Sequence, residues 1–413
     1  RAGRQHHRVM AATKALLWLS KAQPLTQKTI LGQTVKGWLF ILHQNASSAS
    51  LLTSPPLCGY LALIGDVMAE ILNFSETANA TRDALSDLQH HFSADLAKVE
   101  IAISHHMSSA AALIPEIGEH IIGAGGKRLR PLLTLSAAAL SGYKGENHVT
   151  LATAVEYMHT ATLLHDDVVD DSDMRRGKPT ARKVWGNQAS VLVGDFLLGQ
   201  AFRMMVSARS LESLDILSGA AAVIAEGEVM QLAALQNTHM SEDHYLAIID
   251  AKTAALFSAA AEVGGVIADA GTPEIEALKS YGRNLGIAFQ LIDDALDYGG
   301  VGQVLGKNTG EDFREGKVTL PIILAFHRGG EPERQFWQQA LQNVKSESAT
   351  ESQIEADFAQ ALRYMGKTSA LTDTMARAAH YGEKAKDALG LFAPSRTRDL
   401  LKQLVDFCIL RAY

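Results

Sequence analysis

The sequence predicts an all-α fold. Beyond residue 80, apolar residues recur with helical spacing, beginning with Leu85, Leu88, Phe92 and Leu96. Glycine and proline turns separate the helical stretches, and neither an alternation of strands with helices nor a hairpin signal lies between them. The composition, 47% hydrophobic and 20% charged, is that of a soluble globular protein rich in helix-forming residues. One large helical domain is the simplest architecture for such a chain.

The elements follow one another in a regular order. The apolar spacing predicts helices over 150–170, 187–208, 214–235, 243–268, 273–298, 318–328, 351–364, 370–390 and 396–411. Turn residues separate them, or precede the first of them, at 123–126, 141–142, 177–179, 271–273, 299–300 and 329–330. No internal repeat of fixed period interrupts this succession.

The first part of the chain differs from the rest. Its first 65 residues contain no Asp or Glu, although they carry seven Lys and Arg residues. Such a leader resembles an organelle transit peptide. We favour an extension outside the folded domain, because ordinary acidic content starts beside Met68. The predicted domains are therefore an extension over 1–67 and a helical domain over 68–413. A bacterial cytoplasmic location is expected, or a mitochondrial one if the leader is a genuine transit peptide.

Several classes of function are disfavoured by composition. The net charge of −7 provides no basic field for nucleic acid. No uninterrupted apolar run reaches the roughly 18 residues of a transmembrane helix. The two cysteines, Cys58 and Cys408, have no metal-ligand spacing and form no disulfide framework.

Two aspartate-rich motifs carry the clearest chemical signal. Each has the form Asp-Asp-x-x-Asp, at 166–170 and at 293–297, and each lies in an apolar helical stretch. Residues four apart on a helix project from one face, so Asp166 pairs with Asp170 and Asp293 with Asp297. Alone, either motif would be a solvated charge run or a helix-end acidic patch. Two copies together predict a site for Mg²⁺, which binds a few carboxylates together with substrate phosphates.

Cationic residues provide a partner for phosphate. Gly125-Gly126 precede Lys127, Arg128 and Arg130 at a predicted helix start, where backbone N–H groups and cations could hold a diphosphate. The spacing is not that of a P-loop, and a basic helix start beside a turn is the plain alternative. Arg175 and Arg176 directly follow the first aspartate motif. Lys252, Lys307 and Lys317 lie further along, and each alone would be a surface lysine.

Taken together, these motifs resemble the trans-isoprenyl diphosphate synthase family, and within it the long-chain polyprenyl (octaprenyl, solanesyl and decaprenyl) diphosphate synthases. The matching strings are GGKRLRP at 125–131, LLHDDVVD at 163–170, RRG at 175–177, VLVGDFLL at 191–198, EGEVMQL at 226–232, KTAALF at 252–257, FQLIDDALDY at 289–298, LGK at 305–307 and GKVTLP at 316–321. The resemblance implies an isoprenoid-synthase-type bundle of about ten or more helices around a central cavity.

The resemblance also implies roles for individual residues. Three Mg²⁺ ions, for which Mn²⁺ can substitute, are expected on Asp166, Asp167, Asp170, Asp293, Asp294 and Asp297. The allylic diphosphate is expected on Arg175, Lys252, Lys307 and Lys317. Isopentenyl diphosphate is expected on Gly126, Lys127, Arg130, His159 and Arg176. His159 would otherwise be a core histidine. Thr253 and Gln290 would present oxygens near the reacting carbons.

The implied reaction is elongation of an allylic diphosphate by successive trans condensations with isopentenyl diphosphate. The product chain is expected to run along the helix that ends at Asp166, past the small residues Ala161 and Thr162 toward Met158. A deeper floor would be formed by Tyr157, Phe196 or Phe202. Small residues there favour long products, so Ala161→Phe should shorten them.

Other interpretations remain open at the level of sequence. A short-chain (farnesyl or geranylgeranyl) synthase, a class I terpene cyclase and a non-catalytic subunit of a heteromeric synthase are the alternatives. By resemblance, the chain forms a homodimer, its product supplies a quinone side chain, and the apolar product brings the enzyme to the membrane surface.

Overall fold

The computed structural model describes residues 84–410, apart from 124, 300–309, 345 and 347–348. The chain divides into two compact units, Arg1–Ser75 and Glu76–Tyr413, and every described residue belongs to the second. The predicted boundary at residue 67 and the predicted ligand Lys307 therefore lie outside the described residues.

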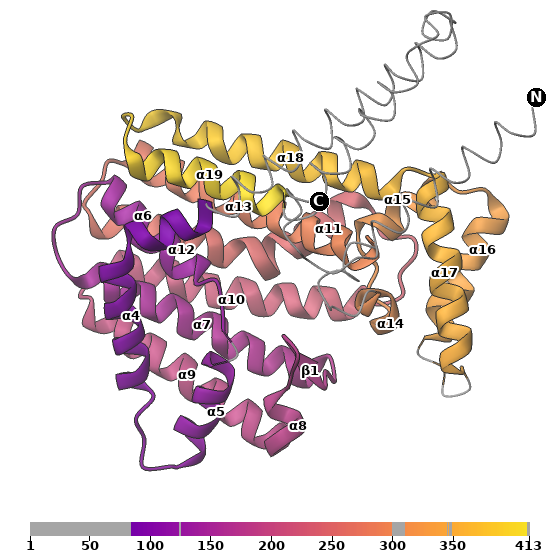
Figure 1. Cartoon of the computed structure of the whole chain (residues 1–413), viewed down its shortest axis with the longest axis horizontal. Helices are drawn as coiled ribbons and strands as arrows, with labels where there is room; N and C mark the ends of the chain where they lie inside the picture. Colours follow the sequence, from indigo (N-terminus) through magenta and orange to yellow (C-terminus); the bar gives the residue numbers. More distant parts are fainter. Residues whose placement is uncertain (1–83, 124, 300–309, 345, 347–348, 411–413) are drawn as a thin grey trace, which may run out of the picture. The chain divides into compact units, whose positions relative to one another are not determined.

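The second unit is helical, as predicted, and within the described residues one small hairpin is its only sheet (Figure 1). Its elements are α4 (Ser93–His106), α5 (Leu113–Ile122), α6 (Leu129–Leu140), α7 (Asn147–Val169), β1 (Met174–Arg175), β2 (Lys178–Pro179), α8 (Ala181–Trp185), α9 (Asn187–Ser207), α10 (Leu211–Ala233), α11 (Glu242–Ile249), the π-helix η1 (Asp250–Ala254), α12 (Ala255–Ile267), α13 (Thr272–Tyr298), α14 (Glu311–Glu315), α15 (Leu320–Arg328), α16 (Glu331–Asn343), α17 (Glu351–Lys367), α18 (Ala370–Ala388), the 3₁₀ helix η3 (Leu389–Leu391) and α19 (Arg396–Leu410).

Local sequence explains where several helices begin. The hydroxyls of Ser210, Ser241 and Thr350 accept hydrogen bonds from backbone N–H groups three residues later, at the starts of α10, α11 and α17. Helices α13, α15 and α16 carry proline in their first turn, where its missing N–H costs no helical hydrogen bond. The boundaries of these helices lie close to the predicted ones, except for α16, where no helix was predicted.

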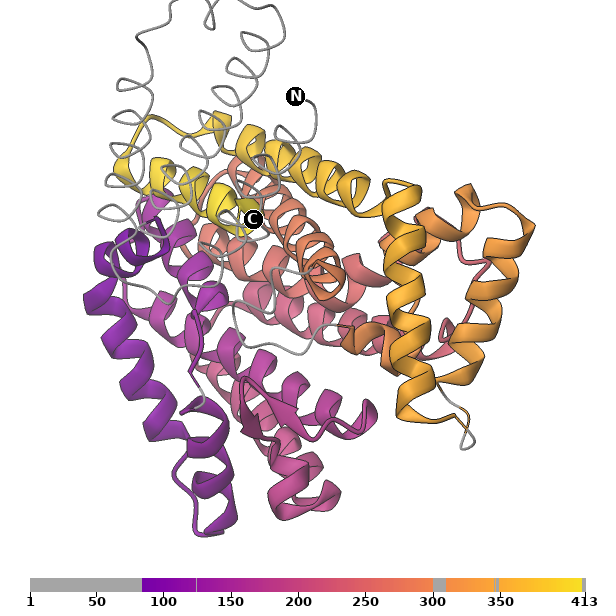
Figure 2. The ribbon, with the colours of Figure 1, turned by 45° about the vertical axis from the view of Figure 1, so that its right-hand side comes forward.

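Two predictions about the elements were wrong in detail. The stretch 243–268 is not one α-helix, because η1 separates α11 from α12. No strand was predicted, but Met174 pairs with Pro179 and Arg175 with Lys178 in an antiparallel hairpin. Gly177 closes its turn at φ 76°, a left-handed conformation that glycine adopts without strain. Figure 2 shows this hairpin beyond the end of α7.

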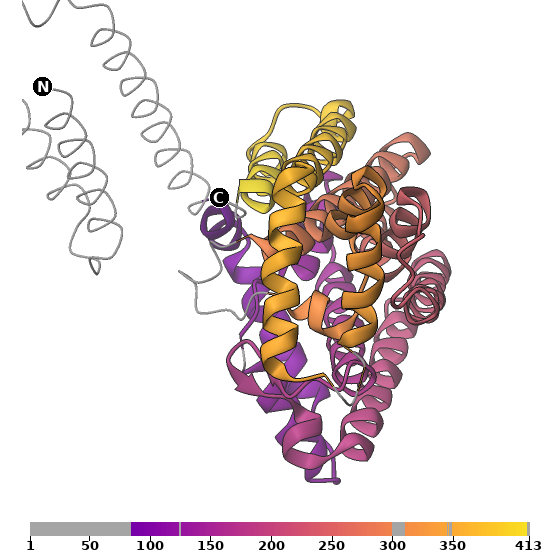
Figure 3. The same ribbon diagram turned by 90° about the vertical axis from the view of Figure 1, so that its right-hand side faces the viewer.

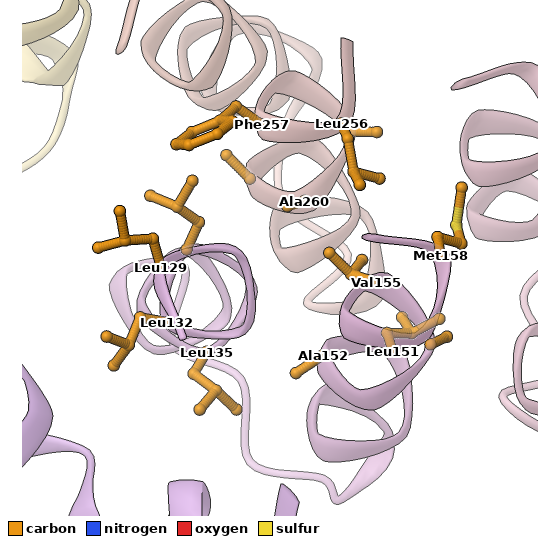
Figure 4. Packing of buried hydrophobic residues seen from close by; sticks show 14 of the residues in the cluster. Leu129, Leu132, Leu135, Leu151, Ala152, Val155, Met158, Leu256, Phe257 and Ala260 are labelled. Carbon is orange, nitrogen blue, oxygen red and sulfur yellow. The ribbon is translucent and has the colours of Figure 1, made fainter. Parts of the chain in front are cut away.

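The core consists of two apolar clusters. One joins α4, α6, α7, α9, α12 and α19, and the other joins α11, α15, α16, α17 and α18. Helix α13 contributes to both. Figure 4 shows part of the first cluster, with Leu129 and Leu132 on α6, Val155 on α7 and Phe257 on α12. At the other end of the unit, α16 and α17 run side by side (Figure 3).

Two glycines allow helices to approach closely. A Cβ on Gly264 of α12 would lie 2.6 Å from Cβ of Ala137 on α6. A Cβ on Gly286 of α13 would lie 2.7 Å from Cα of Ala254 in η1. Both distances are too short for real contacts, so any side chain there would push the helices apart. The second approach brings η1 against the part of α13 that precedes its aspartate motif.

Helices α9 and α10 are unusually apolar and unusually exposed. By length and composition both are long enough and apolar enough to cross a membrane, yet only 39% and 22% of their apolar windows are buried in the bundle. Helix α9 packs on α7, and α10 packs on α12. Their exposed apolar side chains, named here the α9–α10 apolar surface, are Val191, Leu192, Val206, Leu211, Val223, Val229 and Leu232.

Candidate active site

The first aspartate motif ends helix α7. Asp166 and Asp170 lie one helical turn apart and are both half-buried, whereas Asp167 is almost fully buried. Asp167 accepts a hydrogen bond from Nε of Arg175 at 2.8 Å. Asp170 accepts one from Nζ of Lys317 at 2.9 Å. The motif is therefore built into the end of a core helix and is not a solvated charge run.

The second motif lies in the last turns of α13, and two of its aspartates are held by protein donors. Asp294 accepts hydrogen bonds from the Tyr245 hydroxyl at 2.5 Å and the Gln290 amide at 2.7 Å. Asp297 accepts three from backbone N–H groups of residues 310, 311 and 312, at 3.1, 3.0 and 3.0 Å. These contacts fix both carboxylates and make Asp294 and Asp297 supports of the motif.

The π-helix η1 carries two further predicted residues. Thr253 donates its hydroxyl hydrogen to Oε1 of Gln290 at 2.8 Å, which connects it through Gln290 to Asp294. Lys252 donates to Oε2 of Glu228 and Oε1 of Gln231 on α10, both at 2.7 Å. π-Helical turns are frequent at functional sites, because the extra residue re-aims the side chains around it.

Lys317 connects the two aspartate motifs through a short chain of contacts. Its ammonium binds Asp170 at the end of the first motif. Its backbone N–H donates to the Asp312 carbonyl at 2.9 Å, and the Asp312 N–H in turn donates to Asp297 at 3.0 Å. Residues 147 positions apart in the chain are therefore joined by one side chain. This chain of contacts places the two motifs near each other, and the opposition of their carboxylates across one metal site stays a prediction.

The ionisation of the acidic groups reflects this crowding. Burial raises the pKa of Asp166 to about 7, while Lys252 and Arg175 oppose the increase. Burial raises the pKa of Asp294 to about 7 and that of Asp297 to about 6, against the hydrogen bonds they accept. Burial, Asp294 and Asp297 raise the pKa of Asp312 well above its usual value. Buried carboxyls of this kind gain most from a nearby cation.

The donor set fits a hard divalent cation completed by substrate. Among residues 84–410 where they are described, no three acidic, His or Cys side chains form a ready metal cage. Mg²⁺ needs no such cage, because it binds through one or two carboxylates, several waters and substrate phosphates. Asp166, Asp170 and Asp293 offer carboxylate oxygens of the type that it selects.

A second group of cations lies around the start of α6. The Lys127 ammonium stands 4.8 Å from the ring centroid of Phe407, and the Arg130 guanidinium stands 4.5 Å from that of Phe257. Within the described part of the chain, the buried Nε of Arg130 has no hydrogen-bond partner. Arg176 donates to the Gly125 carbonyl. The group is positive, and one of its buried donors is left for an anion.

The positive charge also governs two titratable members of this group. Burial lowers the pKa of Arg130 to about 10, although Glu156 opposes the change. Burial, followed by Arg130, Arg176 and Arg175, lowers the pKa of His159 well below its usual value. His159 is therefore neutral at pH 7 and can donate one N–H to a ligand.

The residues predicted to limit product length lie on α7. Met158 and Ala161 are buried in the first core cluster, and Thr162 is half-buried with its hydroxyl bonded to the His159 carbonyl at 2.8 Å. Tyr157 is fully buried and donates to the Ile103 carbonyl at 2.6 Å. A pocket beside the first motif is lined by Asp167, Arg175 and Arg176 and does not include Ala161, so a product tunnel along α7 stays a prediction.

Four functional side chains were not predicted. They are Tyr245, which binds Asp294, Asp312 beneath the second motif, Glu228, which binds Lys252, and Glu156, which is buried among the arginines. Glu228 lies within a string that resembles the family, so that signal was available. The other three lie in ordinary helical sequence, and nothing local distinguishes them.

Comparisons with known proteins agree with this geometry. The sequence profile of the polyprenyl synthetase family matches residues 111–359. Octaprenyl diphosphate synthase of Escherichia coli (strain K12) is 44% identical over 317 residues, which are 77% of this chain and 96% of that protein.

Solved structures are similar over most of the chain. A decaprenyl diphosphate synthase from Rhodobacter capsulatus has a TM-score of 0.74 and 46% identity, covering 80% of this chain and 99% of that one. A polyprenyl synthase from Caulobacter crescentus CB15, solved with calcium and isoprenyl diphosphate, has a TM-score of 0.75 and 49% identity, covering 80% and 98%. The aspartate motifs, the cations around them and this breadth of similarity lead to one conclusion: the chain belongs to the polyprenyl synthetase family.

Proposed function

We propose that this protein elongates an allylic diphosphate by successive trans condensations with isopentenyl diphosphate and releases a long-chain polyprenyl diphosphate. The observation that carries the proposal is the connection of the two aspartate motifs through Lys317 and Asp312, which supports a common metal site between them. Similarity to octaprenyl and decaprenyl diphosphate synthases supports a long product.

The acidic side of the site would hold the metal. Asp166, Asp170 and Asp293 would bind Mg²⁺, while Asp167, Asp294 and Asp297 support the geometry through their hydrogen bonds. When bound, Mg²⁺ would neutralise the charge that develops on the leaving diphosphate. The expected number is three ions per site, with Mn²⁺ as a substitute.

The cationic residues would divide between the two substrates. Arg175, Lys252 and Lys317 now bind carboxylate or amide oxygens, and the allylic diphosphate would take the place of these groups. Isopentenyl diphosphate would bind at Gly126, Lys127, Arg130, His159 and Arg176, where buried positive charge has an unpaired donor.

The chemistry requires no nucleophilic side chain. The allylic C–O bond ionises, and the electron pair leaves with the diphosphate. The double bond of isopentenyl diphosphate attacks the allylic cation, a C–C bond forms, and the adjacent carbon gives its proton to the departing diphosphate. Gln290 and Thr253 would present oxygens close to the cation. Apolar helices exclude water, which would otherwise quench the cation.

The α9–α10 apolar surface would be covered by a second copy of the chain. Leu192 is 67% exposed and Leu211 is 81% exposed. Side chains of this size are costly to leave in water, and symmetric pairing is the commonest way to bury them. We therefore propose a homodimer.

The cellular setting is inferred more indirectly. We infer a bacterial cytoplasmic enzyme, because the octaprenyl diphosphate synthase it resembles is bacterial. We also propose that its apolar product meets the membrane surface and becomes a quinone side chain. We further propose that residues 1–67 form an extension to a helical domain over 68–413. If those residues are a genuine transit peptide, the location would be mitochondrial.

The test is an assay of purified protein with Mg²⁺, farnesyl diphosphate and isopentenyl diphosphate, followed by product chain-length analysis. Long polyprenyl products are expected. Geranylgeranyl or farnesyl products would mean a short-chain synthase, a cyclised hydrocarbon would mean a terpene cyclase, and activity that needs a second protein would mean a heteromeric subunit. Chelation of the metal should abolish turnover.

A further inference from the structure

Arg128 differs from its cationic neighbours in where its charge is directed. Its Nε donates to Oε1 of Glu100 at 2.7 Å, and its Nη1 donates to Oε1 of Glu156 at 2.8 Å. A third, longer contact joins Nη2 to Glu100 at 3.4 Å. The Arg128 side chain is 13% exposed and that of Glu156 is 7% exposed. This guanidinium is already used by two carboxylates.

The backbone at Arg128 is held in an unusual conformation. Its φ and ψ are 50° and 36°, the left-handed region that residues other than glycine seldom adopt. Such conformations persist where the surroundings over-determine them. Here the two glutamates supply that constraint, because Glu100 belongs to α4 and Glu156 belongs to α7. Arg128 thereby joins three elements at the start of α6.

The same guanidinium lies against the glycine loop. A Cβ on Gly126 would lie 3.2 Å from Nη1 of Arg128 and 3.3 Å from Nη1 of Arg176. Both guanidinium groups therefore crowd the Cβ position of Gly126, the largely buried one of Arg128 and the exposed one of Arg176. Lys127 and Arg130 on either side of Arg128 are directed elsewhere, toward Phe407 and Phe257.

We propose that Arg128 is a positioning residue and not a diphosphate ligand. With Glu100 and Glu156 as its clamp, it fixes the loop so that Gly126, Lys127 and Arg130 hold the homoallylic diphosphate. The inference rests on the proposed function of that pocket. The two glutamates already engage three of the five N–H donors of Arg128. Turning the guanidinium toward a diphosphate would weaken these contacts, and a buried Glu156 that lost its partner is strongly unfavourable.

The experiment measures KM for each substrate, and kcat, in four variants. Arg128→Gln should raise KM for isopentenyl diphosphate about tenfold or more, with KM for the allylic substrate and kcat changed less than about threefold. Glu156→Gln should act in the same direction. The double variant should be no worse than Arg128→Gln alone, since both changes release one clamp. Arg396→Gln, which breaks an exposed ion pair with Asp87, is the matched control.

The outcomes separate the alternatives. If Glu156→Gln leaves KM for isopentenyl diphosphate unchanged or lowers it while Arg128→Gln raises it, Arg128 is a ligand and the proposal is wrong. Lower thermal stability with both KM values unchanged would make the clamp merely structural and would also overturn it. Should Arg128→Gln not fold, Arg128→Lys and Glu100→Gln replace it: each weakens the clamp but retains charge or partner.

A measurement that does not depend on turnover tests the positioning role separately from the proposed function. Hydrogen–deuterium exchange of the peptide spanning residues 125–131 should speed up in Arg128→Gln but not in Arg396→Gln. An inactive wild type would refute the proposed function, yet the exchange rates would still decide whether Arg128 fixes the loop. Unchanged exchange together with unchanged KM values would refute the positioning role.

Discussion

At the scale of single residues, the two aspartate motifs contain unequal carboxylates. Asp294 has both oxygens engaged, by Tyr245 and by Gln290, and Asp297 is engaged by three backbone donors. These carboxylates cannot reorient freely. We expect these two carboxylates to stiffen the end of α13 and to support a cation bound at the motif.

Tyr245→Phe tests this support. Loss of a hydrogen bond to a buried carboxylate costs about 1.5 kcal/mol or more, so we expect about a tenfold higher Mg²⁺ concentration for half-maximal activity. A Mg²⁺ titration of turnover measures it. Tyr281→Phe removes an equally buried hydroxyl, bonded to the Leu401 carbonyl at 2.9 Å, and should lower stability without moving the Mg²⁺ curve. Equal Mg²⁺ curves for wild type and Tyr245→Phe would contradict the support role.

The raised pKa of Asp166, about 7, has a consequence for stability. In the unfolded chain the carboxyl ionises near pH 4, so between about pH 4 and 7 the folded, metal-free protein binds more protons. The Asp166 carboxyl therefore adds most to the free energy of unfolding below about pH 4, and this contribution is lost as the pH rises through about 7. We therefore expect Asp166→Asn to gain thermal stability relative to wild type between about pH 5 and about pH 8.

Thermal melting of metal-free protein across this range measures the effect. Asp387→Asn, on the exposed side of α18, should track wild type at every pH. If the melting temperatures of Asp166→Asn and wild type differed by the same amount at every pH, burial would not raise the pKa of this carboxyl. Added Mg²⁺ and a diphosphate analogue should instead favour wild type, because only the ionised carboxylate binds the cation.

Sequence reasoning predicted the residues proposed to carry the chemistry but not those that contact and hold them. Asp166, Asp293 and Arg130 lie in short segments rich in charged residues, and such clusters of like charge in an apolar helix indicate a bound ligand. Tyr245 reaches Asp294 across 49 positions and Glu156 reaches Arg128 across 28, and no periodic rule connects residues at such separations. Those pairs depend on how helices pack, which only the structure supplies.

At the scale of elements, helix α7 determines both the site and the predicted product length. It carries His159, Ala161 and Asp166 within a few turns, and its buried side packs on α9. Its bounds were predicted closely, because apolar spacing and turn residues agree there. The helix pair around η1 was predicted less well, since the apolar pattern continues through the π-turn and gives no sign of the extra residue.

Ala161→Phe tests the path of the product along α7. A phenyl group at this buried position would block a growing chain, so we expect shorter polyprenyl products with most of the first-condensation rate retained. Product chain-length analysis measures it. Ala359→Phe, at an exposed position on α17, should leave the distribution unchanged. Product lengths equal to wild type in folded Ala161→Phe would exclude this path.

At the scale of the whole molecule, the α9–α10 apolar surface predicts assembly. Leu192→Glu combined with Leu232→Glu places charges on a surface that should be buried between two copies, so we expect monomers by light scattering and reduced activity. Leu391→Glu, on the exposed η3, is the control and should not change the molar mass. A double variant with the mass of wild type would place the interface elsewhere.

The sequence alone was sufficient to predict the helical class and the family, because the motifs between residues 125 and 321 occur in the order that the family shows. It was insufficient for the surface on which we expect a second copy to pack. Exposure of Leu192 or Leu211 depends on which side of each helix the bundle leaves uncovered, and an apolar helix in sequence can be buried all round.

The π-turn of η1 has a consequence for how this chain tolerates change. Deleting one residue between 250 and 254 would restore ordinary α-helical winding and remove the local offset with which the π-turn presents Lys252 and Thr253. Thr253 could then no longer meet Gln290 while Lys252 meets Glu228. Segment length at this point is therefore constrained as strictly as residue identity, and indels here should be far more damaging than most substitutions.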